Sequence, residues 1–246
     1  MMNKYELLLQ KKICFGAIFL FHPLGLFLLK FIFCYHFKNL KHIRKEFQAI
    51  TKQEKGPLLI CPNHLTYVDS ILLFFIFGSF WHYLFHFRTY AWNFPTLKNI
   101  KNNWFYLLIC YLGKSQTIDR QGSPEKIKKS MEKASYLLAQ GNYIVIFPEG
   151  TRSKSGRVDT ENFTYGVGNL LINTPGTKTL CVYLRGNSQK VASNYPARGE
   201  NFYCQLRLIK PTTVHGSMRA ARDLSTQIIQ TLSQMKAEYY STFTPH

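Results

Sequence analysis

A histidine and an aspartate stand five residues apart in the segment PNHLTYVD, as His64 and Asp69. A histidine whose Nδ1 proton is accepted by a carboxylate keeps a lone pair on Nε2 and can act as a general base. Asp69 stands where a helical pattern begins, so its side chain can turn back toward His64. No serine nucleophile motif accompanies the pair, which favours a base acting directly on a substrate hydroxyl. Taken alone, such a pair is more typical of a hydrogen-bonded histidine beside a helix cap.

A second polar loop, PEGTRSKSGR at residues 148–157, follows the apolar segment YIVIF. Gly150 gives its backbone freedom, and its basic side chains suit a phosphate. In isolation the loop is also typical of a charged turn in which Glu149 pairs with Arg152. Both loops follow a predicted buried strand, where open α/β sheets bind ligands. The basic residues of this loop are Arg152, Lys154 and Arg157.

These two loops resemble the two most characteristic sequence blocks of the 1-acylglycerol-3-phosphate acyltransferases, a family of glycerophospholipid acyltransferases. The order of the blocks and their separation of 85 residues (149 − 64) also match. The segment FPEGTRS is highly specific, and two further segments agree in part. The resemblance covers residues 56–190. It rests on Asn63, His64 and Asp69, on FPEGTRS at 147–153, and more weakly on Ile118, Asp119 and Arg120 and on CVYLRG at 181–186.

Two residues depart from the family pattern. Cys181 stands where the family usually has proline, which can alter the geometry of a strand edge near the acceptor. Thr164 stands where many members have lysine, so one cation that could hold a phosphate is absent. The resemblance therefore defines the acyl transfer more closely than the headgroup of the acceptor.

The resemblance implies a reaction and a set of site residues. His64 would deprotonate the free hydroxyl of a lysophosphatidic acid, which attacks the thioester of acyl-CoA or acyl carrier protein to give phosphatidic acid. Asp69 would orient the imidazole, and Arg152 would bind the acceptor phosphate. No cofactor and no metal is expected. By the same analogy the substrate-binding residues are Asn63, Arg120, Glu149, Gly150, Thr151 and Arg152.

Three other functions stay open at this point. The acceptor can be a different lysophospholipid or lysolipid. A lipid hydrolase would use the same histidine on water, although no serine elbow is present. A non-catalytic protein with these motifs would bind anionic membranes without acyl transfer.

The elements that position the loops have the pattern of an α/β layered domain over residues 56–246, with a central sheet flanked by helices. A helix is expected from Asp69 onward. The apolar run 71–87 fits a core helix, a membrane-touching helix or part of an acyl-chain channel. Another helix follows Ser123 and Pro124 and ends at Gly141. Strands are predicted at 58–61, 143–147, 179–184 and 202–209, and a last helix at 217–240.

Residues 1–55 form a separate, membrane-associating part in this interpretation. The apolar segment 13–37 is expected to break at Pro23 and Gly25 into two helices of about 15 to 20 Å, too short for a ~30 Å bilayer core. We expect a helical hairpin in one leaflet; a single span and a cleaved signal peptide are the alternatives. Residues 38–55 predict a basic amphipathic helix, either in contact with anionic lipid or at an ordinary protein surface. Its apolar positions are Leu40, Ile43, Phe47 and Ile50.

Composition fits a globular protein that binds anions. The 246 residues are 46% hydrophobic and carry a net charge of +18, from 31 basic and 13 acidic side chains. The acyl donor, the acceptor and an anionic membrane are all negatively charged, whereas no nucleic-acid-binding module is recognisable. Basic residues on both sides of the apolar segment favour the cytoplasmic face of the inner (plasma) membrane or an equivalent. The six cysteines lack zinc-site spacing and predict reduced, mostly buried thiols.

Overall fold

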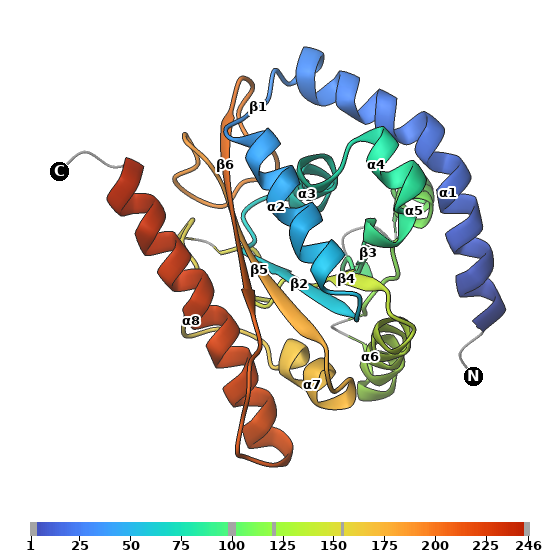
Figure 1. Ribbon diagram of the computed structural model, residues 1–246, viewed down its shortest axis with the longest axis vertical. Coiled ribbons are helices and arrows are strands. Elements are labelled where there is room, and N and C mark those ends of the chain that lie inside the picture. Colours follow the sequence, from blue (N-terminus) through green and yellow to red (C-terminus); the bar gives the residue numbers. More distant parts are fainter. Residues whose placement is uncertain (1–3, 98–101, 120–121, 154, 244–246) are drawn as a thin grey trace.

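The computed structural model describes residues 4–97, 102–119, 122–153 and 155–243. A six-stranded sheet lies between layers of helices, in the order β1-β6-β5-β2-β4-β3 (Figure 1). Neighbouring strands are parallel except β5 and β6, which are antiparallel. The predicted layered α/β domain is therefore confirmed. The strands are β1 (His36–Phe37), β2 (Leu58–Pro62), β3 (Trp92–Asn93), β4 (Tyr143–Val145), β5 (Lys178–Gly186) and β6 (Asn201–Ile209).

The central strands are buried on both faces, which explains why their sequences are continuous apolar runs rather than alternating patterns. In β2, Leu58 and Ile60 pack into the cluster with α2 and α3, while Leu59 and Cys61 pack into the cluster with α6, α7 and α8. Successive strand side chains point to opposite faces, so one strand supports both layers. These helices are α2 (Leu40–Gln53), α3 (Asp69–Phe77), α6 (Pro124–Ala139), α7 (Gly166–Asn173) and α8 (Ser217–Phe243).

All the predicted strands and the helices at Asp69, after Ser123 and at the C-terminal end are present. The sequence analysis missed the two-residue strands β1 and β3 and the short helices α5 (Trp104–Leu112) and α7. Gly168 in α7 allows a close approach to α8, because a Cβ there would lie 2.0 Å from the carbonyl oxygen of Ala221. This contact depends on α8, so the sequence around Gly168 alone has no pattern that predicts α7.

The predicted helical hairpin is wrong. Helix α1 (Lys4–Phe27) runs through Pro23 and continues as the π-helical turn η1 (Leu28–Ile32). Proline removes one helical hydrogen bond, and packing against the domain together with the wider turn compensates for it. Gly25 does not break the helix; it lets α1 approach Phe75, whose ring would lie 2.4 Å from a Cβ at that position.

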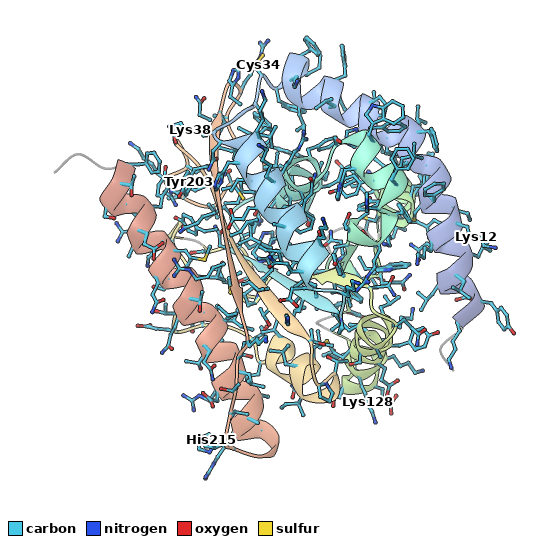
Figure 2. The ribbon with its side chains drawn as sticks, viewed as in Figure 1. Lys12, Cys34, Lys38, Lys128, Tyr203 and His215 are labelled. Carbon is cyan, nitrogen blue, oxygen red and sulfur yellow. The ribbon has the colours of Figure 1, made fainter. Side chains whose placement is uncertain are left out.

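Helix α1 lies along the domain with one face bound and the other exposed. Gln10 donates hydrogen bonds to the carbonyl oxygens of Tyr111 and Ser115, each at 3.0 Å. The helix packs against α4 (Phe80–Phe85) and α5 (Trp104–Leu112). Side chains on its outer side point away from the domain, around Lys12 (Figure 2). The exposed apolar residues of α1 and η1 include Leu8, Leu9, Phe19, Leu20, Leu24, Phe27 and Phe31.

Helix α1 with η1 is the one helical segment among the described residues that is long and apolar enough to cross a membrane. Lys4–Ile32 has 29 residues and a mean hydropathy of 1.9 in its most apolar window, of which 17% is buried. A signal sequence and the core helix of a soluble protein pass the same test of length and composition.

Helix α2 has the predicted amphipathic pattern, and its apolar face is part of the core. Ile43 and Phe47 are buried, and the Phe47 ring stacks on Phe77 with centroids 4.4 Å apart. Arg44 donates to the carbonyl oxygens of Phe75 and Gly78 at the end of α3. The apolar face of α2 therefore packs on the sheet domain and does not face lipid. The division of the chain at residue 55 stays a prediction.

The apolar run 71–87 divides into two helices with different surroundings. Helix α3 is mostly buried, and the chain then becomes extended at Gly78. The following helix α4 exposes Trp81 and Phe85, at 65% and 73%. The first part of the run is thus a core helix, and the second part adds to the exposed apolar surface beside α1.

Candidate active site

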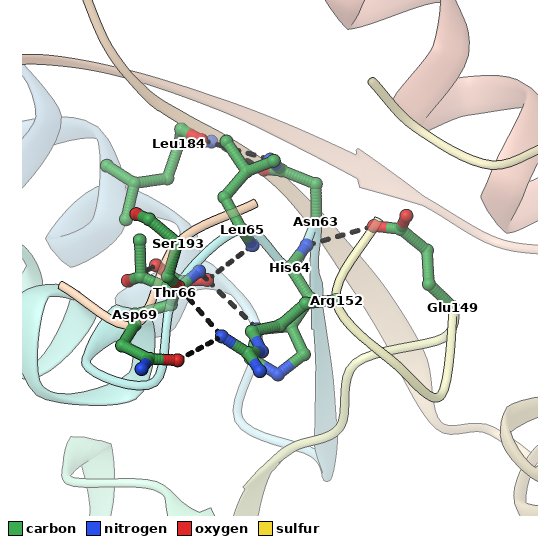
Figure 3. A network of polar contacts seen from close by, with 10 residues as sticks. Asn63, His64, Leu65, Thr66, Asp69, Glu149, Arg152, Leu184 and Ser193 are labelled. Atoms are coloured by element: carbon green, nitrogen blue, oxygen red, sulfur yellow. Dashed lines mark hydrogen bonds and ion pairs between the residues drawn. The ribbon is translucent and has the colours of Figure 1, made fainter. Parts of the chain in front are cut away.

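The loop between β2 and α3 holds the histidine and the aspartate in direct contact. His64 Nδ1 lies 2.9 Å from Asp69 Oδ2, which confirms the predicted contact (Figure 3). The backbone N–H groups of Leu65 and Thr66 donate to the same oxygen at 2.7 and 2.9 Å. The Thr66 hydroxyl donates to the other carboxylate oxygen. Asp69 begins α3, so these contacts fix the carboxylate at the start of the helix.

Two contacts fix the orientation of the imidazole. Asp69 accepts from Nδ1, and the ring stacks on Phe147 with centroids 4.1 Å apart and an interplanar angle of 26°. The side chain of His64 remains 19% exposed. A carboxylate at Nδ1 places the proton of the neutral ring on that nitrogen, so Nε2 carries the lone pair. Within the described residues Nε2 has no hydrogen-bond partner, as a base that acts on a substrate requires.

The second loop is tied to the first by Glu149. Its Oε1 accepts the backbone N–H of His64 at 2.9 Å, and its Oε2 accepts that of Asp159 at 3.2 Å. The backbone N–H of Ser153 also donates to the His64 carbonyl oxygen at 3.0 Å. The two loops that resemble the family blocks therefore form one site. Among the described residues Glu149 makes no ion pair with Arg152, so the charged-turn alternative is wrong.

Glu149 is a buried carboxyl group with a shifted pKa. Burial raises the pKa of Glu149 from 4.5 to about 7, although the two backbone N–H groups oppose that shift. Asn63 has a similar structural role, because its amide donates to the carbonyl oxygen of Leu184 at 3.0 Å and accepts the Leu184 N–H at 2.7 Å. Both side chains hold strands and loops together. A direct contact of Glu149 or Asn63 with substrate stays a prediction.

Arg152 is held in place over the first loop. Its Nη1 donates to the carbonyl oxygen of Ser193 at 2.8 Å and to Oδ1 of Asn194 at 3.0 Å. Its guanidinium carbon lies 3.7 Å from the ring centroid of Tyr67. The cationic group expected from the sequence is thus attached to the His64 loop itself.

Of the remaining predicted site residues, the structure describes Gly150 and Thr151. Gly150 has φ +76, a conformation that favours glycine, and Thr151 is exposed beside it. Arg120 lies outside the described residues. Thr164 donates its N–H and its hydroxyl to the Pro148 carbonyl oxygen, at 3.1 and 3.2 Å, and so closes the loop.

Cys181 corrects one expectation. It pairs with Cys61 on one side and Arg207 on the other, so it lies inside the sheet and not at a strand edge. All six cysteines are free, and four are buried, as the sequence predicts. No group of three or more His, Cys, Asp or Glu side chains in the described residues is arranged to hold a metal ion.

Sequence reasoning missed several residues of the site. Thr66 and Tyr67 lie inside the first motif, between His64 and Asp69. Their hydroxyl group and ring beside these residues could have indicated a role in the site. Ser193 and Asn194 come from the loop between β5 and β6, and nothing near them in the sequence indicates a site. Both residues act through hydrogen bonds with Arg152, which lies 41 residues before Ser193 and 42 residues before Asn194.

Comparisons with known proteins identify a family and a shared fold. The model of the family described as Acyltransferase matches residues 35–184, more than half of the chain. The crystal structure of the 1-acyl-sn-glycerophosphate (LPA) acyltransferase PlsC from Thermotoga maritima is similar, with a TM-score of 0.54 and 15% sequence identity over 99% of this chain and 100% of that chain. At this identity the likeness shows a shared fold. No curated protein sequence matches the chain.

The raised pKa of Glu149 predicts a pH-dependent stability. Between pH 4.5 and about 7 the folded protein binds more protons at Glu149 than the unfolded chain, so this group's contribution to stability falls as pH rises and is fully lost above about 7. The shift corresponds to roughly 3 kcal/mol. We expect Glu149→Gln to remove this dependence, measured as unfolding midpoints from pH 5 to 8.

The exposed Glu132 in α6 provides a control for this measurement. Glu132→Gln should give a curve parallel to that of the unsubstituted protein. A parallel curve for Glu149→Gln as well would mean that Glu149 titrates at its ordinary pKa in the folded protein.

Proposed function

The chain belongs to the Acyltransferase family, and we propose that it transfers a fatty acyl group from acyl-CoA or acyl carrier protein to the free hydroxyl of a lysophosphatidic acid, giving phosphatidic acid. The observation that carries this proposal is the 2.9 Å hydrogen bond from the His64 backbone to Glu149. This bond keeps an oriented base and a cationic loop in one site. The similar protein PlsC is itself an LPA acyltransferase.

In the proposed reaction His64 is the general base. Nε2 takes the proton of the acceptor hydroxyl, whose oxygen attacks the thioester carbonyl carbon. The new ester C–O bond forms as the C–S bond breaks, and the thiolate leaves with the electron pair of that bond. A thiolate is a stable leaving group and then takes up the proton that His64 holds. Asp69 orients the ring and stabilises the imidazolium during transfer.

Arg152 is the proposed anchor for the acceptor phosphate. A guanidinium group binds phosphate with two parallel hydrogen bonds, and Arg152 is attached to the loop that carries the base. Glycine at position 150 keeps the loop backbone open beside it, at φ +76. An acceptor held here presents its hydroxyl to the same small region as His64.

Incubation of the purified protein with labelled acyl-CoA and a panel of lysolipids tests the proposed reaction. We expect labelled phosphatidic acid from lysophosphatidic acid. If only a different lysolipid is acylated, that lysolipid is the acceptor in place of lysophosphatidic acid. Labelled free fatty acid formed without any acceptor would identify a hydrolase, and vesicle binding without any acyl transfer would identify a non-catalytic protein.

We also propose that α1 lies along one leaflet of a membrane, with the exposed apolar side chains of α4 and α5 beside it. The hydrogen bonds from Gln10 to the Tyr111 and Ser115 carbonyl oxygens attach α1 to the domain, which supports a helix in the plane of the membrane over a span. Exposed lysines on α1 favour an anionic cytoplasmic face. Both proposed substrates carry acyl chains, so a site beside the lipid surface reaches them directly.

Replacing the proposed base tests the mechanism. We expect His64→Ala to lower turnover by roughly 10²- to 10⁴-fold, the usual loss for a general base. His64 is partly exposed, so the fold should remain intact. The measurement is the rate of acyl transfer alongside the unfolding midpoint, and a fully active variant would remove His64 from the mechanism.

Replacing the proposed anchor separates the two substrates. Arg152→Ala should raise KM for lysophosphatidic acid by at least about tenfold and change KM for the acyl donor much less, because the lost hydrogen bonds are to the acceptor phosphate. Initial rates with each substrate varied in turn provide the test. An unchanged acceptor KM would show that a different residue holds the phosphate.

The outer face of α1 can be tested with vesicles. Leu20 and Phe31 are 67% and 65% exposed. We expect the double variant Leu20→Asp/Phe31→Asp to lower partition onto anionic vesicles by at least about tenfold, since two apolar side chains that would enter the lipid are lost. Val214→Asp/Met218→Asp changes two even more exposed apolar residues, just before α8 and in its first turn, and should leave binding unchanged. Equal partition of both double variants would contradict the proposal.

A further inference from the structure

Arg152 has three contacts that hold its guanidinium group in place. The ring of Tyr67 lies against the face of the guanidinium group, at 3.7 Å from its centroid to the guanidinium carbon. The Ser193 carbonyl oxygen and Asn194 Oδ1 both accept from Nη1, at 2.8 and 3.0 Å. A long, flexible side chain is thereby confined to one orientation by the protein's own groups.

The groups that hold Arg152 are themselves held to the His64 loop. In the loop between β5 and β6 (residues 187–200), Ser193 donates its N–H to the Leu65 carbonyl oxygen at 3.2 Å. Tyr67 donates its N–H to the Asn194 carbonyl oxygen at 3.1 Å. Figure 3 shows Arg152 within the same network as His64 and Ser193. These hydrogen bonds therefore fix the position of Arg152 relative to His64.

The base of the 187–200 loop is also firmly attached. Glu200 is buried and accepts the N–H and the hydroxyl of Ser188. Arg185, at the end of β5, donates to the carbonyl oxygens of Gly156 and Gln189. These contacts make the loop a support rather than a free surface segment.

The arrangement leaves one edge of the guanidinium group available. Both hydrogen bonds use Nη1, and no described residue accepts from Nε or Nη2. These two nitrogens present parallel donors that match two oxygens of a phosphate. Thr164 is uncharged, and both its donors bind the Pro148 carbonyl oxygen. Among the residues that the structure describes, binding of phosphate at this edge therefore depends on how Arg152 is placed.

We propose that Tyr67 and Asn194 are positioning residues that hold Arg152 with its Nε–Nη2 edge ready for bidentate binding of the acceptor's phosphate. This inference rests on the proposed function, since it specifies how the same site takes its lysophosphatidic acid. Tyr67 fixes the plane of the guanidinium group by stacking. Asn194, with the Ser193 carbonyl, fixes its rotation within that plane.

The test measures binding without turnover. The full-length protein with His64→Ala is titrated with a short-chain lysophosphatidic acid below its micelle concentration. We expect Tyr67→Leu and Asn194→Ala each to weaken binding by about 5- to 20-fold, as expected when a charged hydrogen bond loses its support. Tyr67→Phe keeps the ring and should stay within about twofold of the parent. Asn201→Ala changes an exposed asparagine at the start of β6 and should have no effect.

A double-substitution cycle separates positioning from a general structural effect. If Tyr67 acts through Arg152, Tyr67→Leu should cause no further loss once Arg152→Ala is present. In the active enzyme the single variants should raise acceptor KM by the same 5- to 20-fold, with kcat and donor KM changed by less than about twofold. Unfolding midpoints close to that of the parent confirm that the variants fold.

Three outcomes would overturn the inference. Unchanged binding by Tyr67→Leu and Asn194→Ala would refute it while leaving the proposed function intact. Losses that add fully to that of Arg152→Ala would show that the two residues act independently of Arg152. Failure of the parent itself to bind lysophosphatidic acid would refute the proposed function, and the inference with it.

Discussion

A buried carboxylate, Glu149, accepts one backbone N–H from each of two loops, that of His64 in the first and that of Asp159 in its own. Removing a carboxylate from water is unfavourable, and burial raises the pKa of Glu149 to about 7. Glu149 joins the loop that carries His64 to the loop that carries Arg152. These two loops lie far apart in the sequence, so no short stretch of backbone connects them. The geometry of the site therefore depends on a group that makes no contact with His64's own imidazole.

Sheet topology explains why these distant residues meet. Strands β2 and β4 are parallel neighbours, so the loops after their carboxyl ends emerge at the same edge of the sheet. Strand β5 lies on the other side of β2, and Asn63 binds the backbone of Leu184 near its end. The third loop, between β5 and β6, then folds back over the first two and supplies the groups that hold Arg152. Three loops from adjacent strands thus build one site.

The catalytic candidates and the central strands could be predicted because their information is local. His64, Asp69 and the FPEGTRS segment lie in short motifs, and buried parallel strands are continuous apolar runs. The support for Arg152 could not be predicted, since Asn194 is 42 residues away and acts only after its loop folds back. The prediction for α1 was wrong because a proline such as Pro23 usually ends a helix in local sequence rules. In the structure, packing on α4 and α5 and a π-helical turn keep the helix continuous. The two-residue strands β1 and β3 are too short for any pattern.

Determination of a structure with lysophosphatidic acid bound tests the central claim most directly. The account predicts the free hydroxyl oxygen of the acceptor within about 3 Å of His64 Nε2, and two phosphate oxygens on the Nε–Nη2 edge of Arg152. A complex with the phosphate on a different cation, or with the hydroxyl beyond the reach of Nε2, would contradict it.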